Sequence, residues 1–81
     1  MNVIELAMLK DGAVKRTHDL AQRMLSTTKD EYSLEVVTAL AVVFAAIIHS
    51  EMKNDGMTKE SADKLIYDTS AFVTKMVYEE N

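Results

Sequence analysis

Residues 36–48 read VVTALAVVFAAII, and Thr38 is the one polar residue in this run of thirteen. β-branched residues are common in it, so a buried strand must be considered, but its length and its interspersed alanines favour a helix. A membrane span needs about 20 apolar residues, which is more than the run contains. Charged residues bracket it closely on both sides: Glu31, Glu35, Glu51 and Lys53. We therefore predict a buried core helix over residues 29–53 and no membrane span.

A helical projection of residues 29–53 leaves one narrow polar edge and a wide apolar arc. The edge is formed by Glu31, Glu35, Thr38, Val42, His49 and Lys53. The apolar arc is broad enough to be covered by two neighbouring helices. Any part of it that they leave open should meet another copy of the chain, because large exposed apolar patches are rare on soluble monomers.

An amphipathic helix is predicted before this run, over residues 2–25. Its apolar stripe keeps its phase across Gly12, so we predict one helix with a weak point, although an interior glycine costs roughly 1 kcal/mol relative to alanine. In the turn that follows, Thr28 and Glu31 have the spacing of a capping box, which predicts the start of the next helix.

A third helix is predicted over residues 59–79, where apolar residues recur at three- and four-residue spacing. Gly56 suits the left-handed position that ends the preceding helix, and Thr58 is a good N-cap. Two short turns between three helices predict an all-α fold, a compact three-helix bundle that forms a single domain over residues 1–81. With 81 residues, no cysteine and no Cys/His cluster, apolar packing must hold the domain together, and we expect it to self-associate.

The composition also bears on compartment and chemistry. Absence of cysteine fits a reducing cytoplasm, and the first residues, MNVIELAMLKDG, lack the basic leader of a signal peptide. The two glycines are isolated and form no phosphate-binding motif. His18 and His49 have no carboxylate or second histidine at the three- or four-residue spacing of a helical metal site. We therefore predict a protein that is not an enzyme and uses no cofactor or metal.

The charge distribution argues against nucleic acid as a partner. The net charge is −4, and residues 30–81 carry ten acidic residues against four basic ones. Binding to a phosphate backbone needs clustered lysine and arginine, which this chain lacks. A small dimeric DNA-binding regulator remains the alternative if two copies bring Lys15, Arg16 and Arg23 together.

Several residues lie outside the core stripes and are candidates for contact with a partner. Tyr67, Ala71, Thr74 and Tyr78 share one face of the third helix, nearly opposite its core stripe. Tyrosine is enriched at interfaces because it offers a large rigid surface and a hydroxyl that tolerates water. Ile4 and Met8 form a second apolar pair outside the stripe of their helix, suited either to packing or to contact with another chain.

These observations predict a non-enzymatic interaction module, a homodimer or higher homo-oligomer that modulates another protein as an inhibitor or adaptor. Small acidic helical proteins of this kind include ones encoded by phages and other mobile elements, and the size and charge of this chain fit that origin.

Overall fold

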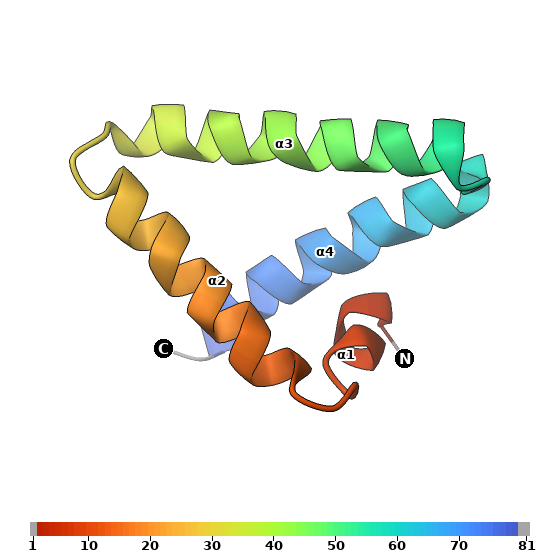
Figure 1. Ribbon diagram of the computed structural model, residues 1–81, viewed down its shortest axis with the longest axis horizontal. Helices are drawn as coiled ribbons and strands as arrows, with labels where there is room; N and C mark the ends of the chain where they lie inside the picture. Colours follow the sequence, from red (N-terminus) through yellow and green to blue (C-terminus); the bar gives the residue numbers. More distant parts are fainter. Residues whose placement is uncertain (1, 80–81) are drawn as a thin grey trace.

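The computed structural model describes residues 2–79, and all regular structure in that range is helical (Figure 1). The helices are α1 (Val3–Ala7), α2 (Ala13–Thr28), α3 (Ser33–Asn54) and α4 (Lys59–Glu79). The predicted all-α class is therefore confirmed, with three long helices and one short additional helix at the start.

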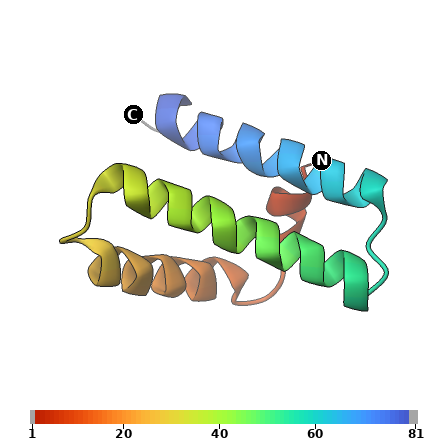
Figure 2. The same cartoon turned by 90° about the horizontal axis from the view of Figure 1, so that it is seen from above.

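The long helices are arranged around α3. In Figure 1, α2 and α4 cross below α3, but Figure 2 shows that they lie on opposite sides of it. α4 packs against both α1 and α3, whereas α2 approaches the other helices at few points. One side of α3 is thus supported within the chain, and the side towards α2 is open.

The prediction of one helix over residues 2–25 is wrong, because the chain turns at residues 8–12. Gly12 has a left-handed backbone with φ of +75°, a conformation that glycine adopts without steric cost. The Arg16 guanidinium braces the turn by donating to the Asp11 carbonyl at 3.0 Å. The apolar stripe stays in phase across this break, which is why periodicity alone did not reveal it.

The predicted capping box at the start of the central helix is also wrong. α2 continues to Thr28, and α3 begins only at Ser33. The hydroxyl of Thr28 donates back to the Met24 carbonyl at 3.0 Å, within its own helix. Threonine makes this bond when it lies in a helix, and its oxygen then caps nothing downstream.

The predicted boundary between the second and third long helices is confirmed. Gly56 has a left-handed φ of +74° just after α3. The Thr58 hydroxyl accepts a hydrogen bond from the Ser61 amide at 3.1 Å, which caps the N-terminus of α4.

The interior enclosed by one chain is small. Among residues 2–79 the buried apolar side chains are Ala13, Ile48 and Ala62, while twenty large apolar side chains are exposed. Within a single chain the prediction of a buried central helix is therefore not met. The physical reason is the break at Gly12, which leaves α1 only five residues long, together with the separation of α2 from α4.

Candidate interaction surfaces

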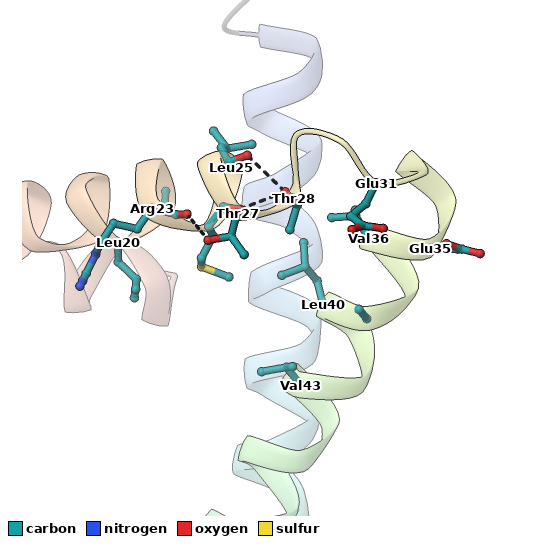
Figure 3. A pocket seen from close by; sticks show the side chains of 13 residues that line it. Leu20, Arg23, Leu25, Thr27, Thr28, Glu31, Glu35, Val36, Leu40 and Val43 are labelled. Atoms are coloured by element: carbon teal, nitrogen blue, oxygen red, sulfur yellow. Dashed lines mark hydrogen bonds between the residues drawn. The ribbon is translucent and has the colours of Figure 1, made fainter.

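An apolar groove with a volume of about 650 Å³ runs between α2 and α3 (Figure 3). Its walls are mostly aliphatic, and they include Leu20, Met24, Leu25, Val36, Leu40 and Val43. Two threonine hydroxyls of α2 also line it, but Thr27 donates to the Arg23 carbonyl at 2.9 Å and Thr28 to that of Met24. The groove therefore offers much apolar surface and few free polar groups.

Opposite charges flank this groove. Arg23 lies on the α2 side, and Glu31 and Glu35 lie on the α3 side (Figure 3). Charged side chains that border an apolar seam favour particular partners and orientations, as they do in coiled coils.

Sequence reasoning missed the groove because it assigned the apolar residues of α2 to a core shared with the other helices. The sequence feature that could have indicated the groove is the very wide apolar arc of α3. Ile48 is buried, but Leu40 and Val43 of the same helix are exposed.

The four predicted partner-binding residues on α4 lie together on one exposed face. Tyr67 is 74% exposed and Tyr78 is 79% exposed, and with Ala71 and Thr74 they border an open hollow of about 320 Å³. Neither ring is used for packing within the chain. The placement agrees with the spacing argument, and binding at this face stays a prediction.

The face formed by Tyr67, Ala71, Thr74 and Tyr78 is called the tyrosine face below. Ile4 and Met8 are not part of it. Both are half-buried, on and just after α1, and neither borders the hollow. α1 itself packs against α4. The structure thus places the two predicted groups on separate surfaces.

A buried carboxylate holds α1 on α4. Asp68 is only 5% exposed, and its Oδ2 accepts hydrogen bonds from the Val3 amide at 2.9 Å and from Lys64 Nζ at 3.1 Å. The Asn2 side-chain amide donates to the Asp68 carbonyl at 2.9 Å. The Val3 amide, helped by Lys64, lowers the pKa of this carboxyl, although burial opposes the shift. The only sequence signal for this carboxylate is Lys64, four residues earlier.

Several of the remaining cations are paired along their own helices. Lys15 contacts Asp19 at 2.7 Å, and Lys59 contacts Asp63 at 2.8 Å. The Asp63 carboxylate, through its hydrogen bond and its charge, raises the pKa of Lys59. Interleaving of opposite charges gives no continuous basic stripe for a nucleic-acid backbone, so the DNA-binding alternative gains no support from this arrangement.

No group of three or more His, Cys, Asp or Glu side chains within residues 2–79 is placed to hold a metal ion. His18 and His49 are both exposed, on α2 and α3 respectively.

α3 is long and apolar enough to cross a membrane by length and composition. It has 22 residues, and an 18-residue stretch of it has a mean hydropathy of 1.9. Only 6% of that stretch is buried in the structure. The core helix of a soluble protein passes the same test, so this finding alone is weak evidence for a span.

No protein-family model, curated protein or solved structure matches this chain.

Proposed function

We propose that this chain is a non-enzymatic protein–protein interaction module. It assembles with copies of itself and acts in the cytoplasm as an inhibitor or adaptor of another protein. One observation carries the proposal: the chain exposes 6914 Å², about 2,000 Å² more than the roughly 4,900 Å² expected for a compact monomer of this mass. Much of that surface is aliphatic or aromatic, and patches of this kind mark interaction sites on soluble proteins.

The two surfaces suit different partners. The aliphatic groove between α2 and α3 resembles an unfilled core, which supports self-association. The tyrosine face of α4 mixes rigid aromatic rings with Thr74 and Lys75, a composition typical of contacts that form between separately folded proteins.

The tyrosine face is tested by capture of partners on immobilised protein from a lysate of the source organism, followed by mass spectrometry. A Tyr67→Ala/Tyr78→Ala variant should lose proteins that the unaltered chain retains. Tyr32→Ala is the matched control, because Tyr32 is 80% exposed but lies before α3, away from the tyrosine face. If the double variant and the unaltered chain retain the same proteins, the tyrosine face is not a binding site.

A second candidate is membrane association through α3, favoured by the apolarity and exposure of this helix. The packing of α4 against α3 argues against a span, because α3 would have to give up that contact to be surrounded by lipid. Flotation with liposomes tests this candidate: protein that rises with the vesicles supports membrane association, and protein left at the bottom excludes it.

A further inference from the structure

We infer that the groove between α2 and α3 is filled by a second copy of this chain, whose own α2–α3 hairpin packs into it about a two-fold axis. The inference rests on the self-association in the proposed function and deepens it by naming the interface. In such a dimer two helical hairpins form a four-helix core, and each chain supplies the layer that the other lacks.

The exposed area has the size that a stable homodimer needs. The excess of about 2,000 Å² belongs to the whole chain, the α4 face included, so about 4,000 Å² is the upper limit of what two copies could bury, and it lies within the range of obligate homodimers. Interfaces of that class are apolar and resemble a protein core cut in two. The groove walls fit this description, since Leu40 and Val43 are large aliphatic residues left about half exposed.

The chemistry of the groove favours a helix over a small ligand. Binding pockets for small molecules contain a few free polar groups that fix the ligand's orientation. Here the hydroxyls of Thr27 and Thr28 are occupied by carbonyls of their own helix, and the charged groups Arg23, Glu31 and Glu35 flank the apolar walls. A groove between two helices instead accepts the apolar stripe of a third helix, and this chain carries such stripes itself.

The charges at the rim select a second copy and its orientation. A two-fold axis running along the hairpin places α2 of each copy over α3 of the other, with both α2–α3 turns at the same end. Arg23 of one copy then lies beside Glu31 and Glu35 of the other, on both sides of the dimer. Opposite charges flanking an apolar seam favour this register over one that brings like charges together.

Sedimentation velocity tests the inference with one pair of adjacent substitutions. Val43 lines the groove, whereas Val42 lies on the polar edge of α3. The unaltered chain and Val42→Lys should sediment as dimers, and Val43→Lys should weaken the dimer by at least about 100-fold, because it buries an unpaired charge. A Val43→Lys chain as dimeric as the unaltered one overturns the inference.

A thiol-protection experiment covers the case in which Val43→Lys fails to fold. The chain has no cysteine, so a single introduced cysteine reports on its own surroundings. Val43→Cys should react slowly with a maleimide at concentrations where that variant sediments as a dimer, and quickly on dilution, while Val42→Cys should react quickly at both. Equal reactivity in a dimer overturns the groove as the interface but leaves self-association standing. A chain that is monomeric at all concentrations overturns both.

A charge exchange tests the predicted orientation. Arg23→Glu and Glu35→Arg should each raise the dimer dissociation constant by about 3- to 10-fold, since the contact occurs twice in a two-fold dimer. Combining them should restore most of the affinity. A double variant no tighter than either single one overturns the proposed register.

Discussion

The two ends of this molecule are held in different ways. At the contact of α1 with α4, a buried carboxylate bonds the Val3 amide and a lysine, and the Asn2 side chain bonds a backbone carbonyl, although no residue of α1 is fully buried. Between α2 and α3 the reverse holds: apolar area is plentiful, and few contacts within the chain cover it. The comparison separates a region completed by its own sequence from a region that another molecule must complete.

The largest loss of stability is expected where the chain does bury a large aliphatic side chain of α3. Ile48 is 7% exposed, and Ile48→Ala should lower the free energy of unfolding by about 3 kcal/mol through loss of burial and formation of a cavity. Val42→Ala, on the polar edge of the same helix, should change it by less than about 0.5 kcal/mol. Urea titration followed by circular dichroism measures both, and similar losses would mean that Ile48 is not packed as described.

The groove should show an effect that depends on protein concentration. Leu40→Ala should lower the free energy of unfolding by about 2 kcal/mol when the dimer is formed. Leu34→Ala is the control, because Leu34 does not line the groove and is 78% exposed. Thermal unfolding at two concentrations a hundredfold apart provides the measurement. The melting temperature of the unaltered chain should rise with concentration, as mass action requires when only the folded state dimerises.

The turn between α1 and α2 should be sensitive to a single methyl group. Gly12→Ala forces alanine into a left-handed conformation and places its Cβ 2.7 Å from the Arg16 guanidinium, with an expected loss of about 1 kcal/mol or more. Gly56→Ala has the same backbone strain, but its Cβ meets no other atom. It should therefore lose only the part of the stability that comes from the strained backbone. If Gly12→Ala instead gains both stability and helix content by circular dichroism, residues 2–25 prefer one continuous helix.

The smallest expected change is a pH-dependent loss of stability confined to α1 and its contact with Asp68. The depressed pKa of Asp68 means that the folded state binds its proton less readily than the unfolded state, so the stabilisation is fully present above the ordinary value near 3.8. It is lost as the pH falls further, through the lowered pKa of the folded state. The protection factors of the α1 amides, taken against the intrinsic exchange rate at each pH, should therefore fall in acid, and Asp68→Asn should show low protection in α1 already at neutral pH. Unchanged exchange in that variant would mean that the carboxylate does not hold α1.

The sequence predicted those features that depend on periodicity and local chemistry. Three long amphipathic segments, the glycine that ends α3 and the threonine that caps α4 all follow from short-range rules. Tyr67 and Tyr78 were placed on an exposed face by spacing alone. Each of these depends on residues within a few turns of one another.

What could not be predicted depends on choices between competing local structures or on distant contacts. In sequence, Thr28 is compatible with a cap of the next helix and with a place in its own helix, and in the structure its hydroxyl bonds back to its own helix. Gly12 is likewise compatible with a straight helix or a turn. The burial of Asp68 follows from the folding back of α1 onto α4, a contact between residues about 65 positions apart. The open groove could not be located from sequence, because the width of the apolar arc does not say which part of it the neighbouring helices leave uncovered.

The loose attachment of α2 has a consequence for the lifetime of the protein in a cell. Proteases cleave segments that open easily, and a helix with few tertiary contacts opens at little free-energy cost. A newly made chain without a partner should therefore be degraded quickly, while the same chain in a complex should persist. The amount of this protein would then follow the supply of whatever covers α2, with no dedicated control of its synthesis.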